Sequence, residues 1–198
     1  DRWIPTGIGM MKFVNPKESY KDGAVYPKVD PAIRYADILL MYAEALNELT
    51  TTYQIASWDG SETYSISRDV AAMKAAVLPV RLRAGLPNFD EIGMGDLYTN
   101  PDELRTVLKR ERQIEFLGEN QRYFDLRRWK DAPEEESQMI YGCNTTVPKE
   151  SREFFYEQVV VPSVQTSWSM KKYFWPIAYN ELKRNARLTQ APGWPSFD

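Results

Sequence analysis

The most informative stretch of this 198-residue chain is RERQIEFLGENQRYFDLRRW, from Arg110 to Trp129, where charge, aromatic rings and helix-compatible spacing are denser than elsewhere. Between Glu103 and Asp131 lie eight basic and six acidic side chains, a net charge of only +2. Many are three or four residues apart, the spacing of neighbours on a helix surface. We therefore predict that they pair inside the fold. The residues expected to form this ion-pair network are Arg112, Glu115, Arg122, Asp125 and Arg128.

A basic patch for phosphate or nucleic acid is the alternative interpretation of the same stretch. The acids interleave too evenly with the bases to leave one positive face. The whole chain has a net charge of −3 and a pI of about 5.3, so nothing attracts it in general to a polyanion. We expect no nucleic-acid partner.

Start and stop signals predict helices on both sides of this stretch. Asp30 and Pro31 suit a helix N-terminus, as do Asn100 and Pro101, while Pro79 lies inside a helical pattern and should kink or split it. The predicted helices span residues 31–49, 69–84, 101–117 and 120–130. In the first of them the apolar spacing predicts a buried face made of Tyr35, Ile38, Leu39, Tyr42, Leu46 and Leu49.

The remaining segments are irregular. Residues 50–67 are predicted to be a loop around an Asp59-Gly60 turn, and 134–136 a solvated acidic turn. After residue 144, β-branched and aromatic runs at 154–156, 159–161 and 173–177 predict short strands or extended segments. The predicted fold class is mostly α, with helix pairs like those of tetratricopeptide repeats, long irregular loops and a few short strands.

Histidine is absent, and Cys143 is the single cysteine. These absences remove most catalytic triads, most zinc and copper sites and any intrachain disulfide. We therefore expect no cofactor, no metal and no catalysis. Loop carboxylates keep a glycoside hydrolase open as a less favoured alternative, and the candidates are Asp59, Glu62, Asp90, Glu91 and Asp96.

Aromatic residues make up 13% of the chain, more than a core of this size needs. In the 50–67 loop, Trp58, Tyr64 and Tyr53 have no helical register that would bury them. Such rings can stack on the C–H face of a sugar while a neighbour such as Asp59 bonds its hydroxyls. These four residues are the predicted ligand-binding set. The alternative is a loop held in place by its own rings.

Four motifs, in the right order, resemble the C-terminal half of the SusD/RagB family of outer-membrane nutrient-binding proteins. They are RYADILLMYAEALNEL at 34–49, VRLRAGLP at 80–87, the opening stretch at 110–129, and YFWPIAYNELKRNARLTQAPGW at 173–194. The likeness covers the chain from about residue 26 to its end. It implies that residues 1–198 are the C-terminal part of a SusD/RagB-like domain, a fragment without the N-terminal half and lipoprotein signal.

The resemblance implies a non-catalytic, lipid-anchored protein facing outward from the outer membrane. Such a protein binds a glycan or another oligomeric nutrient and passes it to a SusC-like TonB-dependent transporter. No window of the sequence is apolar over the roughly 18 residues that a membrane span requires, so membrane contact is expected only through an anchor outside this chain. A tetratricopeptide-like scaffold that binds only protein partners is the main alternative.

Overall fold

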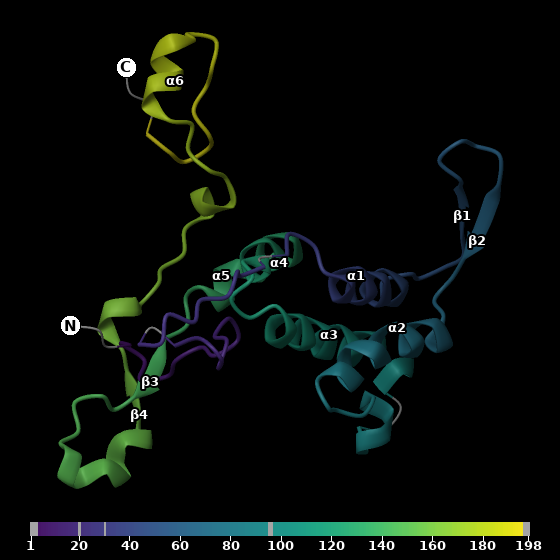
Figure 1. Ribbon diagram of the computed structural model, residues 1–198. Coiled ribbons are helices and arrows are strands. Elements are labelled where there is room, and N and C mark those ends of the chain that lie inside the picture. The colour runs from purple at the N-terminus through teal and green to yellow at the C-terminus, as the bar shows by residue number, and fades with distance from the viewer. Residues whose placement is uncertain (1–3, 20, 30, 95–96, 196–198) are drawn as a thin grey trace. The chain divides into compact units, whose positions relative to one another are not determined.

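Three helices carry the hydrophobic core of residues 27–122, one of the two units into which the chain divides. The computed structural model describes residues 4–19, 21–29, 31–94 and 97–195. In this unit α1 (Tyr35–Asn47) packs against both α2 (Val70–Arg83) and α3 (Pro101–Glu115) (Figure 1). The core side chains they share include Leu40, Leu46, Met73, Val77, Val80, Leu104 and Leu108.

The start of α3 confirms the predicted cap at Asn100, and α2 has a side-chain cap that the sequence analysis did not predict. The Asp69 side chain accepts a hydrogen bond from the backbone N–H of Ala72. The Asn100 side chain accepts from the N–H groups of Asp102 and Glu103, and Pro101 follows it as the first helical residue. Each cap satisfies backbone donors that the first helical turn leaves without a partner.

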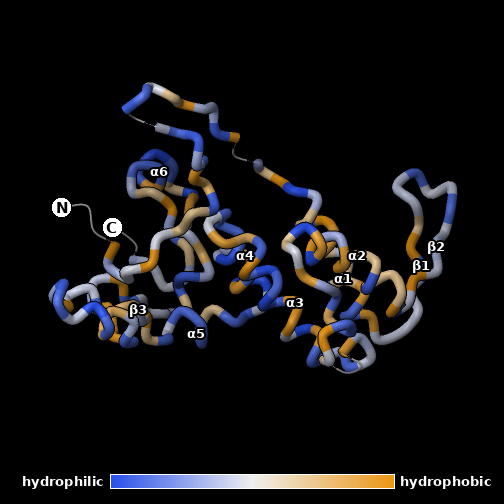
Figure 2. The backbone as a smooth tube through the Cα atoms, turned by 60° about the horizontal axis from the view of Figure 1, so that its bottom comes forward, coloured by the Kyte–Doolittle hydropathy of each residue, from blue (hydrophilic) through white to orange (hydrophobic). Residues whose placement is uncertain are grey.

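The sequence interpretation of α1 was wrong in two respects. The helix begins at Tyr35 with Arg34 as its N-cap, not at residue 31, and Asp30 lies outside the described residues. Of the predicted face, Leu46 is buried and Leu39 and Leu49 pack partly buried against the core, but Tyr35, Ile38 and Tyr42 are exposed. The fully buried positions of the helix are Asp37, Leu40, Ala43, Leu46 and Asn47. Because Asp37 is ion-paired with Arg112 of α3, the helix turns this polar position inward (see below). Figure 2 shows hydrophobic and hydrophilic residues alternating along α1 and α2.

Pro79 does not split α2, which continues from Val70 to Arg83. Proline removes one helical hydrogen bond, the one its own nitrogen would donate to the carbonyl of Ala75. Both Pro79 and Ala75 are exposed, so water can reach that carbonyl. The position on the solvent side explains why one continuous helix tolerates the residue.

Residues 50–67 form an antiparallel hairpin rather than the predicted loop. Strand β1 (Tyr53–Ala56) pairs with β2 (Thr63–Ile66), with Tyr53 opposite Ile66 and Ile55 opposite Tyr64. The predicted turn at Asp59-Gly60 is confirmed, and Gly60 has φ +71°, a conformation that glycine adopts without strain. Alternating Tyr, Ile and polar residues explain the strands, because a hairpin with one apolar face needs that period of two.

The second unit combines residues 1–26 with 123–198. It holds most of α4 (Gln121–Trp129), then α5 (Ala132–Glu135), strands β3 (Tyr141–Cys143) and β4 (Gln158–Val160), and α6 (Tyr179–Arg184). Strands β3 and β4 pair antiparallel. Three 3₁₀ helices, Lys149–Tyr156, Pro162–Val164 and Met170–Tyr173, connect these elements.

The expected extended segments of this unit are only partly confirmed. The run at 159–161 does contribute to β4, but the run at 154–156 belongs to a 3₁₀ helix and 173–177 forms no strand. The acidic run at 134–136 is mostly the short helix α5 rather than a turn. In the runs at 154–156 and 134–136 the local tendency toward extended or turn structure yields to one or two turns of helix closed by backbone hydrogen bonds, whereas residues 174–177 are neither helix nor strand.

The architecture as a whole confirms the predicted fold class, with mostly helical elements and few short strands. The first predicted helix pair is present, because α1 packs on α2. The second pair, α3 with α4, stays a prediction, since the boundary between the two units falls in the first turn of α4. Among the described residues no helix has the length and apolar character to cross a bilayer.

Candidate functional site

The β1–β2 hairpin presents one apolar face, made of Tyr53, Ile55, Tyr64 and Ile66. These residues share a face because side chains alternate along each strand and the register places them opposite one another. Tyr53, Ile55 and Tyr64 are 45 to 49% exposed. The opposite face is polar, with a hydrogen bond from Gln54 to Ser65. The hairpin therefore holds two tyrosine rings in a fixed relation while leaving about half of each accessible.

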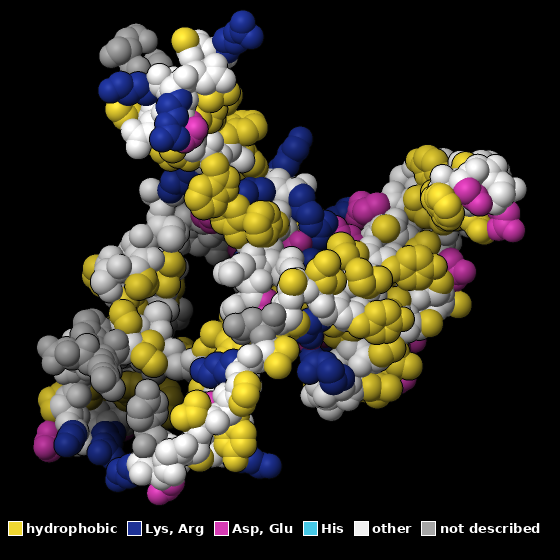
Figure 3. All heavy atoms as spheres, turned by 45° about the horizontal axis from the view of Figure 1, so that its top comes forward, with side chains coloured by type: hydrophobic (Ala, Val, Ile, Leu, Met, Phe, Trp, Pro, Cys, Tyr) yellow, Lys and Arg dark blue, Asp and Glu magenta, His cyan; other side chains and the backbone are white. Residues whose placement is uncertain are grey.

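Trp58 lies in the turn of this hairpin and is 98% exposed. Figure 1 shows the turn at the end of β1 and β2 farthest from α1 and α2, and Figure 3 shows hydrophobic and acidic side chains side by side on this projection. Leaving nearly the whole indole surface in water is unfavourable in free energy, because this apolar surface is not buried. The structure thus places Trp58, Tyr53 and Tyr64 on one hairpin, two on its face and one at its tip.

Asp59 organises the turn itself. Its Oδ1 accepts hydrogen bonds from the Ser57 hydroxyl at 2.7 Å, from the Ser61 hydroxyl at 2.8 Å and from the Ser61 backbone N–H at 3.1 Å. Hydrogen bonds from Ser57 and Ser61 lower the pKa of this carboxyl to about 2. The structure gives Asp59 a role in shaping the turn, and its predicted contact with a ligand stays a prediction.

Tyr64 also has a local partner. Its hydroxyl donates to Glu62 at 2.6 Å, and this hydrogen bond raises the pKa of Tyr64. The bond fixes the direction of the phenol and leaves the faces of its ring to other contacts. A flat ring with a pinned hydroxyl is already close to the geometry needed for stacking, which lowers the entropy lost on binding.

The first part of the predicted ion-pair network lies in the three-helix unit and is mostly buried. Arg112 donates to Asp37 at 2.8 Å, with the arginine side chain only 2% exposed. Glu115 accepts from Arg34 at 2.7 Å and also pairs with Arg83. Arg112 and Glu115 thus join α3 to both neighbouring helices. Sequence spacing could not identify Arg34, Asp37 or Arg83, because they are distant along the chain.

The second part lies at α4. Asp125 is buried and pairs with Arg128 at 2.8 Å, one turn further along the same helix. Arg122 is the last residue of the three-helix unit, so its predicted pairing with Asp125 of the other unit stays a prediction. A further arginine of α4 with several partners is Arg127, which the sequence analysis did not single out. Its guanidinium pairs with Glu136 at 2.8 Å and lies 3.4 Å from the centre of the Tyr123 ring.

Two concave pockets open beside Arg127 in the second unit. The larger has a volume of about 750 Å³ and is lined by Arg127, Lys130, Met170, Lys171, Tyr173, Phe174, Pro192 and Gly193. The smaller, of about 320 Å³, is lined by Tyr123, Arg127, Lys172, Phe174, Trp175, Pro176 and Trp194. We call them the C-terminal pockets. One feature of the sequence could have indicated these pockets, namely the clustering of Trp168, Lys171, Lys172 and the aromatic run at 173–175.

Two of the loop acids considered for hydrolysis, Asp59 and Asp90, do not have the electrostatics of a general acid. Such a group needs a raised pKa, whereas Asp59 has its pKa lowered to about 2 by its turn and Asp90 has its pKa lowered by a hydrogen bond from Lys74. Asp96 lies outside the described residues. Within the described ranges, no group of three or more His, Cys, Asp or Glu side chains could hold a metal ion.

Helical packing, buried ion pairs and exposed aromatic side chains together define a mostly helical protein. The chain belongs to the SusD family, because the sequence profile of that family matches residues 2–194. It is 30% identical over 156 residues to SusD-like protein P2 of Formosa agariphila, an alignment covering 79% of this chain and 24% of that protein.

Two solved structures share the fold. A SusD-like protein from Bacteroides fragilis is 29% identical, with a TM-score of 0.57, and the match covers 82% of this chain and 25% of that one. The selenomethionine form of a protein named BT4246 is 27% identical, with a TM-score of 0.71, over 96% of this chain and 30% of its own. The chain therefore spans about a quarter of the length of these relatives.

Proposed function

We propose that this protein binds a glycan or a similar oligomeric nutrient at the cell surface, without catalysis, and passes it to a SusC-like TonB-dependent transporter of the outer membrane. Membership of the SusD family supports this general role. A lipid anchor outside this chain would hold the protein at the membrane. The observation that carries the proposal is Trp58, almost fully exposed at the tip of a hairpin with two half-exposed tyrosines on its face.

Aromatic rings suit carbohydrate because a pyranose ring presents C–H groups on its faces, and these pack against a π surface while the hydroxyls remain hydrated. Trp58 offers the largest ring, and Tyr53 and Tyr64 offer a second contact. Soluble proteins seldom leave so much aromatic area in water without a partner. The loop acids Asp59 and Asp90 have lowered pKa values, so they are not prepared to act as general acids.

The test is calorimetry of the natural full-length protein against a panel of oligosaccharides, with and without Trp58→Ala. We expect the variant to keep its melting temperature, because the side chain is not part of the core, and to lose roughly tenfold in affinity, as stacked aromatic contacts contribute about 1–3 kcal/mol. Trp58→Phe, which keeps an aromatic ring, should bind with intermediate affinity.

Tyr156→Ala is the matched control, since this residue is also an aromatic and is 83% exposed, but lies in the other unit. It should bind as the parent protein does. Equal affinity of the parent and Trp58→Ala for every sugar would contradict the hairpin as the site. Release of reducing ends from any polysaccharide, abolished by a single Asp or Glu substitution, would instead support the hydrolase alternative.

A protein-interaction scaffold is the second candidate, and the exposed apolar face of α1 favours it. Tyr35, Ile38 and Tyr42 lie on that face and are 47 to 73% exposed. Copurification of the full-length protein with its transporter, unaffected by sugar but lost in Tyr35→Ser, would support this role. If sugar binding depends on Trp58, protein interaction is at most a secondary function of this chain.

A further inference from the structure

The larger C-terminal pocket combines cations with rings and lacks acids. Its lining includes Arg127, Lys130 and Lys171, together with the rings of Tyr173 and Phe174. None of its lining residues, all of them within the described part of the chain, is Asp or Glu. The volume of about 750 Å³ lies within the usual range of ligand sites, roughly 300–1,000 Å³.

The three cations of this pocket differ in how far their charges are compensated. The charge of the Arg127 guanidinium is already compensated, because the group pairs with Glu136 and donates to the backbone carbonyls of Tyr123 and Lys172. Lys171 lies 4.6 Å above the ring of Trp194, and among the described residues no acidic side chain pairs with it. Lys130 is exposed at the C-terminal end of α4. The pocket therefore presents two lysine charges to whatever enters it.

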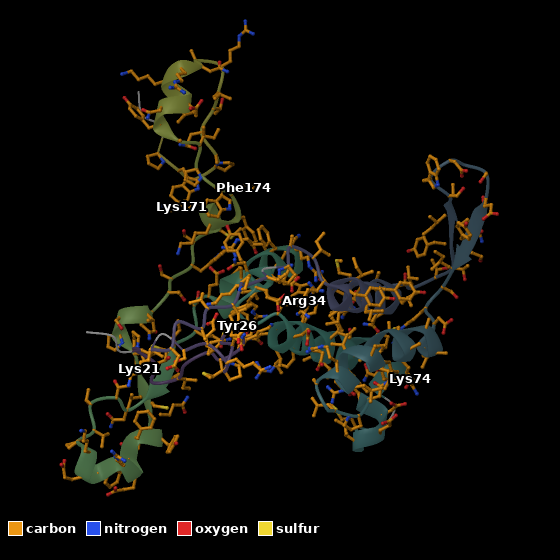
Figure 4. The ribbon with its side chains drawn as sticks, in the orientation of Figure 1. Lys21, Tyr26, Arg34, Lys74, Lys171 and Phe174 are labelled. Carbon is orange, nitrogen blue, oxygen red and sulfur yellow. The ribbon has the colours of Figure 1, made fainter. Side chains whose placement is uncertain are left out.

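The wall around Lys171 is fixed by backbone contacts. The indole N–H of Trp194 donates to the carbonyls of Lys171 and Phe174, both at 3.1 Å. Gly193 has φ +78°, and a Cβ placed there would lie 2.9 Å from the Cβ of Lys171. The chain thus closes tightly on Lys171 at a position where only glycine fits. Figure 4 shows Lys171 and Phe174 close together, before the segment that leads to α6.

The smaller pocket extends the same surface. It shares Arg127 and Phe174 with the larger one and adds Lys172 and Trp175, again without an acidic lining residue among those described. Trp175 is 74% exposed, and its ring centre lies 5.8 Å from that of Tyr123. Ring faces and ammonium groups therefore alternate across the two pockets.

We propose that the C-terminal pockets bind an acidic sugar unit, whose carboxylate or sulfate meets Lys130 and Lys171 while its ring packs on the neighbouring aromatics. This inference rests on the proposed function, because it assigns a chemical class to the glycan. A neutral sugar would use the rings and leave both charges unused. A long polyanion such as nucleic acid fits poorly, since the chain as a whole carries a net charge of −3.

The experiment compares three probes on the full-length protein by calorimetry: trigalacturonate, its methyl ester and a sulfated galactose trisaccharide. We expect the acidic probes to bind and the neutral ester to bind at least tenfold more weakly. Lys130→Gln and Lys171→Gln should each weaken binding of an acidic probe about fivefold, in line with the loss of one charge-assisted contact. Raising the salt concentration should lower the affinity of the parent protein for the acidic probes toward that of the two variants.

Lys130→Arg keeps the charge and should retain most of the affinity, which separates electrostatics from damage to the fold. Lys183→Gln removes an exposed lysine of α6 that lines neither pocket, and it should change nothing. Preference for the carboxylated over the sulfated probe, or the reverse, identifies the source of the negative charge.

Equal binding of trigalacturonate and its ester would overturn the inference and leave the proposed function standing. Acidic-sugar binding that depends on Trp58 but not on Lys130 or Lys171 would overturn the pockets as the site. Absence of binding to any sugar would overturn both the inference and the proposed function.

Discussion

At the scale of single residues, the pair of Arg112 and Asp37 links α3 to α1 inside the fold. The arginine side chain is 2% exposed and the aspartate side chain 9%. If one charge is removed, water therefore cannot replace it as a partner for the other. Breaking such a buried pair leaves an isolated charge in a poorly solvated position. The pair also decides which face of α1 points inward.

Asp37→Ala is expected to lower the free energy of unfolding by about 3–5 kcal/mol, because it removes a buried carboxylate that pairs with the buried Arg112 guanidinium. Chemical denaturation of the full-length protein, followed by far-ultraviolet circular dichroism, measures the loss. Glu181→Ala breaks the exposed pair with Arg184 in α6 and should cost no more than about 0.5 kcal/mol. Comparable losses in the two variants would refute the role of the buried pair.

The pH dependence of the hairpin turn follows from Asp59. Its folded pKa of about 2 is below the ordinary 3.8, so the ionised form is the one that the turn stabilises. The stabilisation is present above about pH 4 and is lost as the pH falls toward 2. Chemical shifts of the Ser57 and Ser61 amides should report a midpoint near 2. A midpoint near 4 would show that the turn does not depend on the carboxylate.

At the scale of elements, sequence signals predicted the beginnings of helices better than their faces. Asp69 and Asn100 cap α2 and α3 through hydrogen bonds to residues two or three positions away, and local interactions of that kind are visible in a sequence. The inward face of α1 depends on Asp37 meeting Arg112, 75 positions along the chain. A long-range ion pair has no local pattern, so apolar spacing alone correctly assigned Leu39, Leu46 and Leu49 to the core side but wrongly assigned Tyr35, Ile38 and Tyr42.

In the candidate site, too, the sequence revealed local features but not contacts between distant segments. Trp58, Tyr53 and Tyr64 could be selected from composition and position, but their common hairpin could not, because strand pairing joins segments across an irregular turn. The C-terminal pockets bring α4 together with residues 170–194, which are more than forty positions away. Only the folded arrangement identifies Arg127 and Lys171 as neighbours.

Capping of α3 allows a direct test at this scale. Asn100→Ala removes the acceptor for two backbone N–H groups and should cost about 1 kcal/mol, whereas Asn100→Gly should cost only a few tenths. Thermal unfolding of the two variants measures the difference. The account of the α3 N-terminus is wrong if alanine and glycine destabilise the protein equally.

At the scale of the whole molecule, the absence of histidine has a consequence for binding. The ordinary pKa of histidine lies near neutrality, and this chain has none. We expect the ratio of affinities between the parent and Trp58→Ala to stay constant, within about twofold, from pH 6 to pH 8. Calorimetry at three pH values measures it. A ratio that changes several-fold over this range would place a titrating group in the hairpin contact.

Family membership and local geometry contribute different parts of the account. The SusD profile covers residues 2–194 and supports the general role, while the described side chains suggest where a ligand is met. The charged stretch at 110–129, which identifies the family, supplies ion pairs that stabilise the helices. The rings outside it, on the β1–β2 hairpin and around the C-terminal pockets, provide the accessible surface.

The most direct test is a crystal structure of the full-length protein with an oligosaccharide that calorimetry shows to bind. The account predicts an intact sugar ring lying flat against the Trp58 indole, with Tyr53 or Tyr64 in contact. A structure in which Trp58 remains in solvent, whether or not a sugar unit occupies the C-terminal pockets, or in which the sugar has been cleaved, would contradict it.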